Sequence, residues 1–185
     1  PNLRVEKIGG TSMSRFTEIL DNIILRKPDD LFGRVYVVSA YAGVTNDLLE
    51  HKKTGQPGIY KLFEEQENYP RKMLALRDML FEHNETLAGC GLDVNKANDF
   101  IGDRIDLSIN ILRSMENVLA SGYVTRGELL LAARELLASL GEMHSAYNSA
   151  EILKSKGYDS TFVDLIGWED GRQLTIDQRI KDSFD

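Results

Sequence analysis

Apolar residues recur along the chain at two different spacings, and the spacing predicts which segments are strands. Residues 3–8 alternate between apolar and polar side chains, and residues 34–40 form a nearly continuous apolar run rich in valine. Residues 160–166 combine β-branched and aromatic side chains after a Gly-Tyr pair. Alternation is typical of half-buried strands, and continuous apolar runs are typical of strands buried in a parallel sheet. We therefore predict a mostly parallel sheet with at least these three strands.

The middle of the chain has an apolar residue at every third or fourth position, which is the period of a helix with one buried face. This spacing predicts helical segments over residues 60–87, 95–120, 126–140 and 145–156. Pro70 divides the first segment, because proline fits the first turn of a helix but not its interior. Ser121–Gly122 is expected to end the second segment, and Gly141 to separate the last two.

The last part of the chain contains a turn signal. Asp170–Gly171 is a dipeptide that favours hairpins, so residues 173–176 are expected to return as a strand. Together these elements predict one α/β domain, a three-layer α/β/α sandwich with a mostly parallel sheet and helices on both of its faces. A chain of 185 residues is long enough to bury a substantial core as a single domain.

Two glycines follow the first predicted strand and precede a short helix. Lys7 lies near the end of that strand, and Gly9 and Gly10 are followed by Thr11 and Ser12. Glycine lets the backbone turn sharply and approach a ligand, and a helix that starts there offers free N–H groups to an anion. The lysine precedes the glycines, so the loop is not a P-loop, and the Gly-x-Gly-x-x-Gly dinucleotide pattern is absent. The loop is either a phosphate site with a lysine cation or an ordinary turn.

The second predicted strand ends in a similar way. Ser39 closes the strand, and Gly43 to Asn46 lead into the next helix. In an open α/β sheet, ligands bind at the carboxyl ends of the strands, so Ser39 and Thr45 are expected in the same crevice as Lys7. In the alternative interpretation, Thr45 only caps the helix that follows it.

A third candidate precedes the apolar helical run that starts near residue 129. Glu128 lies in the first turn of the predicted helix, where a carboxylate is either a ligand for a cation or a capping partner that complements the helix dipole. Arg126 lies just before it. Arginine grips carboxylates bidentately, but this one could equally be a surface residue.

Taken in order, these three motifs resemble those of the aspartokinases, which belong to the amino-acid kinase superfamily. The resemblance covers residues 5–164 and rests on Lys-x-Gly-Gly-Thr-Ser, Val-Val-Ser-Ala-x-x-Gly-Val-Thr-Asn and a Gly-Glu pair that opens a helix. Ile8 stands where the family usually has phenylalanine, and Arg126 where it usually has histidine. The spelling of the first motif is most similar to the aspartokinases associated with ectoine biosynthesis.

The resemblance implies a kinase that transfers the γ-phosphoryl group of ATP, bound with Mg²⁺, to L-aspartate. The product, 4-phospho-L-aspartate, would enter the ectoine pathway or the synthesis of aspartate-family amino acids such as lysine and threonine. In this scheme Lys7 contacts the transferred phosphoryl group, and Gly9, Gly10, Thr11 and Ser12 lie against the phosphates. Phosphoryl transfer depends on positioning and charge stabilisation, which these residue types can supply.

The resemblance also implies a set of residues around the aspartate substrate. Ser39 would lie near the substrates, Thr45 would contact the aspartate, and Glu128 would bind its α-amino group. Arg126 is a further candidate for the substrate carboxylates. Asp164, near the end of the third predicted strand, is expected to support these residues without contacting the substrate itself.

Two features of the family are not found in this sequence: the Gly-Gly-Ser-Asp signature of the nucleotide-binding half, and the regulatory ACT domains. Residues 1–185 are therefore expected to form a truncated fold, the N-terminal, amino-acid-binding part of an aspartokinase catalytic domain. Such a part is expected to be inactive by itself, and the full-length protein to be a homo-oligomer. The alternatives are a fragment that only binds substrate or assembles, another carboxylate or carbamate kinase of the superfamily, and a structural protein that binds no nucleotide.

Composition narrows the class of protein further. A net charge of −7 disfavours nucleic-acid binding, which depends on basic surfaces. No apolar run approaches the roughly 20 residues that span a bilayer, and no signal peptide is visible, so we expect a cytoplasmic protein. Cys90 is the single cysteine, which fits a reducing compartment. The three histidines lack metal-binding spacing, so no metal is predicted beyond Mg²⁺ carried by ATP.

Overall fold

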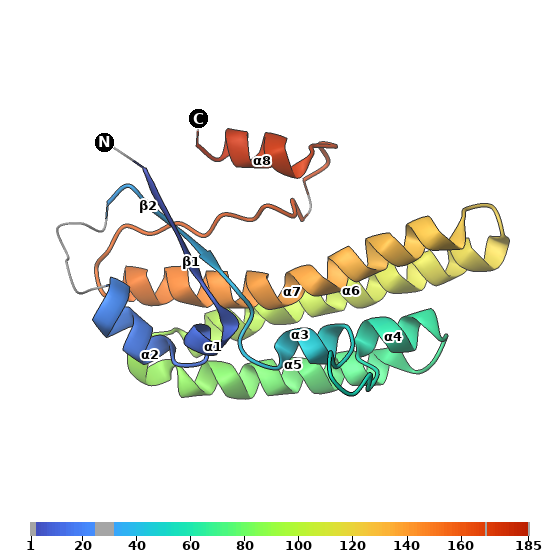
Figure 1. The fold of residues 1–185 in the computed structure, drawn as a ribbon, viewed down its shortest axis with the longest axis horizontal. Coiled ribbons are helices and arrows are strands. Elements are labelled where there is room, and N and C mark those ends of the chain that lie inside the picture. The colour runs from blue at the N-terminus through green and yellow to red at the C-terminus, as the bar shows by residue number, and fades with distance from the viewer. Residues whose placement is uncertain (1–2, 25–31, 169, 185) are drawn as a thin grey trace.

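The computed structural model describes residues 3–24, 32–168 and 170–184. Its main body is a layer of three long helices, α5 (Tyr69–Thr86), α6 (Val94–Ser121) and α7 (Arg126–Ser155), which lie side by side (Figure 1). Two shorter helices, α3 (Val44–Leu48) and α4 (Ile59–Glu64), pack against α7. The apolar stripe of α6 faces the interior of this layer, as the spacing of its residues predicts, with Ala97, Ile101, Ile105 and Leu112 fully buried.

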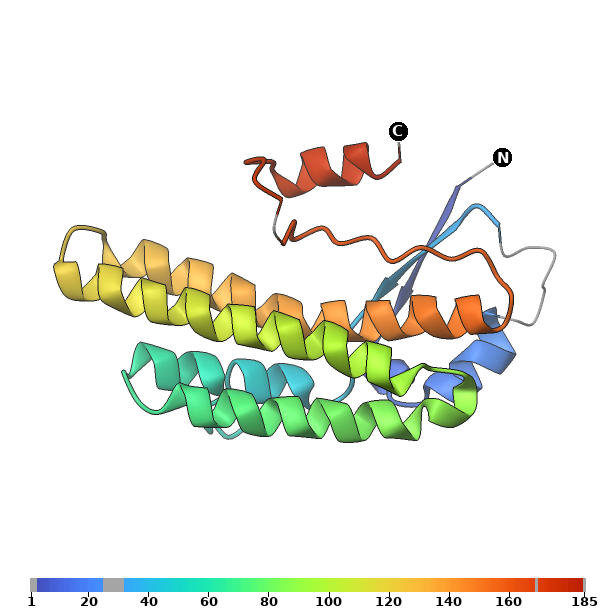
Figure 2. The ribbon, with the colours of Figure 1, turned by 180° about the vertical axis from the view of Figure 1, so that it is seen from behind.

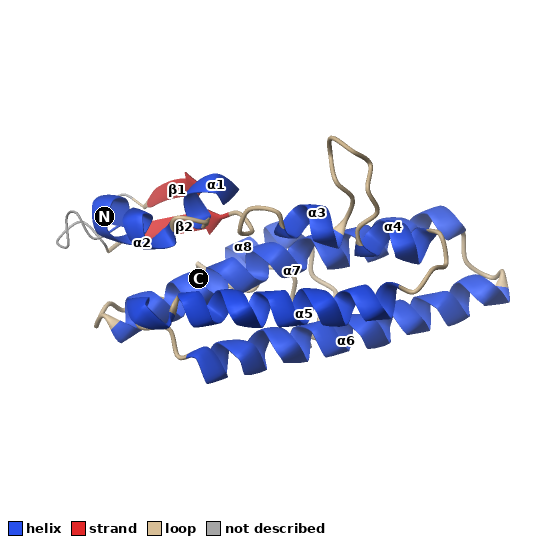
Figure 3. Ribbon diagram, turned by 90° about the horizontal axis from the view of Figure 1, so that it is seen from below, coloured by secondary structure: helices blue, strands red, loops and turns tan. Residues whose placement is uncertain are grey.

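Two strands, β1 (Arg4–Ile8) and β2 (Arg34–Val38), form a parallel sheet with Arg4 opposite Arg34 and Ile8 opposite Val38. The sheet crosses α7, which contacts β2 (Figure 1). The short segments that follow β1 are α1 (Gly10–Met13), α2 (Phe16–Ile19) and the π-helical turn η1 (Leu20–Ile24). The helices α1 and α2 lie beside the strands at one end of the long helices (Figure 3). The parallel pairing of the first two predicted strands is thus confirmed.

The third predicted strand is wrong. Residues 160–166 form no strand, and they run as an irregular segment along α6 and α7 (Figure 2). The ring of Phe162 packs edge-on against Phe100 and Tyr147, and Ser160 Oγ donates to the carbonyl of Ala150 at 2.6 Å. Packing on the helices therefore accounts for Phe162, whereas Val163 and Ile166 of this segment are exposed. The described residues are α/β with two strands, and the three-layer sandwich is not confirmed.

Gly141 does not separate two helices, because α7 continues unbroken for 30 residues. A Cβ at Gly141 would lie 2.6 Å from the Cβ of Ala40 and 3.4 Å from side-chain atoms of Val44 and Leu48. Glycine in a helix interior costs about 1 kcal/mol relative to alanine. Here it allows α7 to approach the segment that follows β2, so the glycine is a packing residue rather than a helix end.

The other helix boundaries agree with the sequence signals. Pro70 lies in the first turn of α5, where the side chain of Asn68 accepts from the backbone N–H of Arg71 at 3.3 Å. Helix α6 begins at an Asp93 cap and ends at Gly122, whose φ of 69° is the left-handed conformation that glycine adopts easily. A short 3₁₀ turn, η3 (Ala88–Cys90), joins α5 to α6.

The predicted hairpin at Asp170–Gly171 is also wrong, because Thr175 caps a final helix, α8 (Ile176–Asp182). The side chains and backbones of Thr175 and Gln178 bond reciprocally, which is a capping box. Asp170 instead binds Arg172 and Arg179, and these hydrogen bonds hold the pKa of its carboxyl well below the usual range. No described helix has the length and apolar character needed to span a bilayer.

Candidate functional site

The carboxyl ends of the two strands lie next to each other. Ser39, directly after β2, donates its N–H to the carbonyl of Ile8 at 3.0 Å. On the other side, a Cβ at Gly10 would lie 2.9 Å from the carbonyl oxygen of Ala40. A larger residue than glycine would push the two loops apart, so the second glycine of the Gly-Gly pair is required by this approach. The structure therefore brings the first two candidate motifs together.

The phosphate candidates surround this point on the β1 side. Lys7 is exposed on β1 opposite Val37, and Gly9 is the extended residue before α1. Thr11 is exposed and Ser12 half-buried in the single turn of α1. The first N–H groups of a helix have no partner within the helix, which leaves them available to an acceptor. A lysine cation and backbone donors thus lie at the same carboxyl end of the strands.

The loop that follows β2 is held by side chains from two other elements. Ser14 Oγ accepts from the backbone N–H of Ala42 at 2.8 Å. Ser145 Oγ, from α7, donates to the carbonyl of Ser39 at 2.8 Å and to the carbonyl of Glu142 at 3.1 Å. The single hydroxyl of Ser145 therefore links the backbone of Ser39 to the backbone of Glu142.

Thr45 is half-buried in α3, one residue after the point where Val44 lies against Gly141. The helix begins at Gly43, whose φ of 87° lies in the left-handed region. Because Gly43 is the N-cap residue, Thr45 lies inside α3 and is not its cap. Thr45 thus shares this end of the sheet with Ser39 and with the Gly141 turn of α7.

Arg126 and Glu128 are not brought to this site. They lie in the first turn of α7, and Glu128 precedes Gly141 by 13 residues, which is about 20 Å along a helix. Thr125 Oγ1 donates to Glu128 Oε2, and Arg126 Nη2 donates to the carbonyl of Glu64 at the end of α4. Both side chains are engaged locally, although Glu128 bonds to the side chain of the N-cap residue Thr125 and no capping box is formed there.

Sequence reasoning missed Glu142. The chain contains a second Gly-Glu pair, Gly141–Glu142, and this pair lies on the α7 turn that contacts Ser39 and Ala40. Glu142 is exposed, and partial desolvation by the neighbouring protein raises the pKa of its carboxyl. An isolated glycine inside an otherwise helical pattern often has a packing reason. That signal was available in the sequence, where Gly141 was taken for a helix boundary.

Asp164 is not at the end of a strand. Its carboxylate forms an ion pair with Arg104 of α6 at 3.0 Å, and its other oxygen accepts from the N–H of Ile166 at 3.0 Å. The Arg104 guanidinium also lies over the ring of Trp168, 4.9 Å from its centre. In this structure Asp164 fastens the irregular segment to α6.

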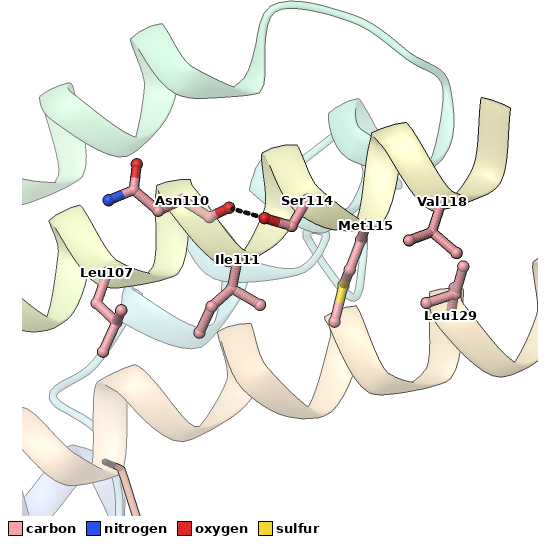
Figure 4. A pocket seen from close by; sticks show the side chains of 7 residues that line it. All are labelled: Leu107, Asn110, Ile111, Ser114, Met115, Val118 and Leu129. Carbon is pink, nitrogen blue, oxygen red and sulfur yellow. Dashed lines mark hydrogen bonds between the residues drawn. The ribbon is translucent and has the colours of Figure 1, made fainter. Parts of the chain in front are cut away.

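A groove of the described residues lies elsewhere. It has a volume of about 400 Å³ and lies between α6 and the start of α7 (Figure 4). Its lining is apolar apart from two residues whose bond is to each other, since Ser114 Oγ donates to the carbonyl of Asn110 at 2.9 Å. The lining consists of Leu107, Asn110, Ile111, Ser114, Met115, Val118 and Leu129. This groove offers no charged group for phosphate chemistry.

Within the described ranges, no three His, Cys, Asp or Glu side chains are grouped so that they could hold a metal ion. Cys90 is half-buried, and its Sγ lies 3.2 Å from Thr17 Oγ1. The strand ends therefore present a lysine, backbone donors and hydroxyls, and Glu142 lies on the adjoining turn of α7.

Comparison with known proteins agrees with the motifs. The chain is 42% identical, over 97% of its length, to the aspartate kinase Ask_Ect of Stutzerimonas stutzeri (strain A1501). The chain is homologous to an aspartate kinase. The aspartokinase resemblance is thus confirmed, while the chain spans only 39% of the length of that relative. No protein-family model matches the chain, and no solved structure matches it.

Proposed function

We propose that this chain forms the amino-acid-binding part of an aspartate kinase, which converts ATP and L-aspartate into ADP and 4-phospho-L-aspartate. The homologue named aspartate kinase supports this proposal. The observation that carries it within the structure is the hydroxyl of Ser145, which joins the Ser39 loop to the Gly141–Glu142 turn beside the Lys7 strand. Three segments far apart in the sequence meet there, each with a residue type that phosphoryl transfer to aspartate needs.

The β-carboxylate of aspartate is ionised at neutral pH and can attack the γ-phosphorus without a general base. Lys7 would offset the charge that grows on the transferred group, and the backbone N–H groups of the Gly9–Gly10 loop would bind phosphate oxygens. The close approach at Gly10 fits this role, because a Cβ there would fill the space beside the Ala40 carbonyl. Thr11 and Ser12, at the start of α1, are proposed to flank the phosphates.

Magnesium would neutralise phosphate charge and would arrive with the nucleotide, since it keeps several waters and needs few protein ligands. No residue of this chain is therefore proposed as a dedicated metal ligand.

For the aspartate, we propose Glu142 in place of Glu128 as the partner of the α-amino group. A carboxylate forms a charge-assisted hydrogen bond with an ammonium group, which is stronger than a neutral bond. Glu142 is next to the loop that carries Ser39 and Thr45, which remain the other proposed contacts. Arg126 is no longer proposed as a substrate ligand, because it lies at the opposite end of α7.

The relative's name, Ask_Ect, agrees with the sequence resemblance to ectoine-associated aspartokinases. We propose that the 4-phospho-L-aspartate feeds ectoine synthesis rather than lysine or threonine synthesis. A cytoplasmic location and a homo-oligomeric full-length protein are also part of this proposal.

The test is aspartate-dependent formation of ADP from Mg-ATP, measured on the 185-residue chain and on a full-length protein that contains it. The proposal expects turnover by the full-length protein with L-aspartate and none with L-glutamate or bicarbonate plus ammonia. It expects no turnover by the chain alone. Turnover with carbamate or L-glutamate in preference to L-aspartate would instead support another kinase of the superfamily.

A further inference from the structure

A group of buried polar side chains lies directly behind the loop that follows β2. Asn84 of α5 and His144 and Asn148 of α7 are fully buried, and Tyr41 is 4% exposed. Buried polar groups are uncommon in a core and lower its stability unless they are hydrogen-bonded. We call these four residues the buried polar cluster.

The members of the cluster are bonded to one another. Asn84 Oδ1 accepts from His144 Nε2 at 2.7 Å and from Asn148 Nδ2 at 2.9 Å. Asn148 Nδ2 also lies 3.4 Å from the hydroxyl of Tyr41. Asn84 Oδ1 can only accept, so the bond between them is made by the tautomer of His144 with its proton on Nε2. Asn148 Nδ2 lies 3.2 Å from the same nitrogen, and His144 Nδ1 and Asn148 Oδ1 have no hydrogen-bond partner among the described residues. Desolvation, with a smaller contribution from His83, lowers the pKa of His144 to about 3, so its ring is neutral at pH 7.

The cluster is connected to the candidate site on both sides. Tyr41 follows Ser39 by two residues, and its ring lies against His83 with centres 4.0 Å apart and edge-on to His144 at 5.3 Å. His144 and Asn148 belong to the α7 face that also carries Gly141 and Ser145, since these positions are three or four residues apart. The cluster therefore bonds α7 to Asn84 of α5 through His144 and Asn148, and Asn148 also bonds α7 to Tyr41 in the loop that follows Ser39.

We propose that the buried polar cluster is a positioning device, which holds the loop of Ser39–Thr45 and the Glu142 turn in the arrangement that binds the amino-acid substrate. This inference rests on the proposed function. Hydrogen bonds are directional, so the cluster fixes the rotation of α7 about its axis and its position along that axis relative to the loop. Apolar side chains of similar volume would keep the core filled but would allow other packings.

His144→Leu and His144→Gln separate this role from simple filling of the core. Leucine removes the donor to Asn84, while the side-chain amide of glutamine can still donate to it. We expect L-aspartate to bind His144→Leu about tenfold or more weakly, as for other small misplacements of binding groups. We expect His144→Gln to restore binding to within about threefold of the parent chain. Binding is measured by isothermal titration calorimetry.

Ser108→Ala is the matched control. Ser108 is also fully buried and polar, but its hydroxyl donates only to the carbonyl of Arg104 in its own helix. Its loss should leave L-aspartate affinity unchanged. Equal weakening in Ser108→Ala and His144→Leu would overturn the proposal, because any buried polar change would then have the same effect.

Hydrogen exchange gives a second readout that does not depend on the proposed function. The backbone amides of Ser39 and Ala42 are bonded to Ile8 and to Ser14. We expect His144→Leu to speed their exchange at least severalfold, and His144→Gln and Ser108→Ala to leave it unchanged. Unchanged exchange in a folded His144→Leu overturns the positioning role, whatever the chain binds.

The two readouts distinguish the two proposals. If the parent chain does not bind L-aspartate but the exchange pattern is as expected, the proposed function fails and the cluster still positions the loop. Faster exchange with unchanged aspartate affinity overturns the link between the cluster and the substrate. If His144→Leu does not fold, Tyr41→Phe removes only the hydroxyl and carries the same test, with a smaller expected change in both readouts.

Discussion

Helix α7 carries the same dipeptide twice, and its two glycines have opposite surroundings. Gly127–Glu128 lies in the first turn, where nothing lies within 4 Å of a Cβ placed on Gly127 and Glu128 is exposed. Gly141–Glu142 lies in the middle of the helix, where a Cβ on Gly141 would meet the Cβ of Ala40 at 2.6 Å, while Glu142 is exposed like Glu128. The first pair follows a helix cap, and the second lies against the loop that ends β2.

This difference shows that packing, rather than the letters of a motif, decides which Gly-Glu pair can serve a site. A glutamate that opens a helix is favoured by the helix itself, because it complements the dipole and bonds to the cap residue. A glycine in mid-helix is disfavoured by the helix and needs another reason to be there. The pair in the middle of the helix, Gly141–Glu142, is therefore the better indicator of the site.

The largest expected effect is on kcat, and it compares Lys7 of β1 with Arg126 in the first turn of α7. We expect Lys7→Ala to lower kcat of an active kinase that contains this chain by about 10²–10³-fold, because one contact to transition-state charge is lost. Arg126→Ala should leave kcat within about twofold, since an exposed residue away from the site has little effect. Steady-state kinetics with saturating aspartate measures both. A large fall in kcat for Arg126→Ala would contradict this account, because it would mean that the first turn of α7 belongs to the site.

The two glycines give the next largest contrast. Gly141→Ala should destabilise the chain by about 1–3 kcal/mol, because the added methyl group meets the Cβ of Ala40, which cannot move without the backbone. Gly127→Ala has free space and should stabilise by up to about 1 kcal/mol, the difference in helix propensity. Urea unfolding measures both free energies. A stabilising Gly141→Ala would show that α7 does not approach the loop so closely.

The next prediction concerns the contribution of His144, in the middle of α7, to the pH dependence of stability. Burial lowers the pKa of His144 to about 3, so the folded chain binds fewer protons than the unfolded chain between pH 3 and the ordinary value of 6.5. Its contribution is fully present above pH 6.5 and is lost as the pH falls, by at most about 1.4 kcal/mol per pH unit. His83, whose pKa burial also lowers, acts in the same direction.

The control for this prediction is His144→Gln, in which the residue at that position no longer titrates. Urea unfolding at several values between pH 5 and pH 7 gives the unfolding free energy as a function of pH. This free energy should change less with pH in the variant than in the parent chain. The same pH dependence of the unfolding free energy in both chains would mean that folding does not lower the pKa of His144.

The sequence predicted the local features of the fold well. The two parallel strands, the cap of α6 at Gly122 and the helix start at Pro70 all follow from residue-level preferences, and the structure shows each of them. The strand at residues 160–166 failed because aromatic and β-branched residues also suit a segment packed on helices, as Phe162 is. The hairpin failed because Thr175 and Gln178 favour a capping box over a returning strand.

The site was predictable in part. The order of strand, Gly-Gly and short helix was enough to place Lys7 and Gly10 beside Ser39, because the ends of neighbouring parallel strands meet. The choice between Glu128 and Glu142 depended on which turn of a 30-residue helix lies against the sheet. That contact joins residues more than 100 positions apart, such as Ser39 and Ser145, and local patterns do not contain it.

The most direct test of the account is L-aspartate binding by Glu142→Gln and Glu128→Gln, measured by isothermal titration calorimetry against the parent chain. Glutamine keeps the shape and removes the charge, so losing the ammonium partner should weaken binding by about 10–100-fold. The account predicts this loss for Glu142→Gln and unchanged affinity for Glu128→Gln. Weaker binding by Glu128→Gln with unchanged binding by Glu142→Gln would contradict it.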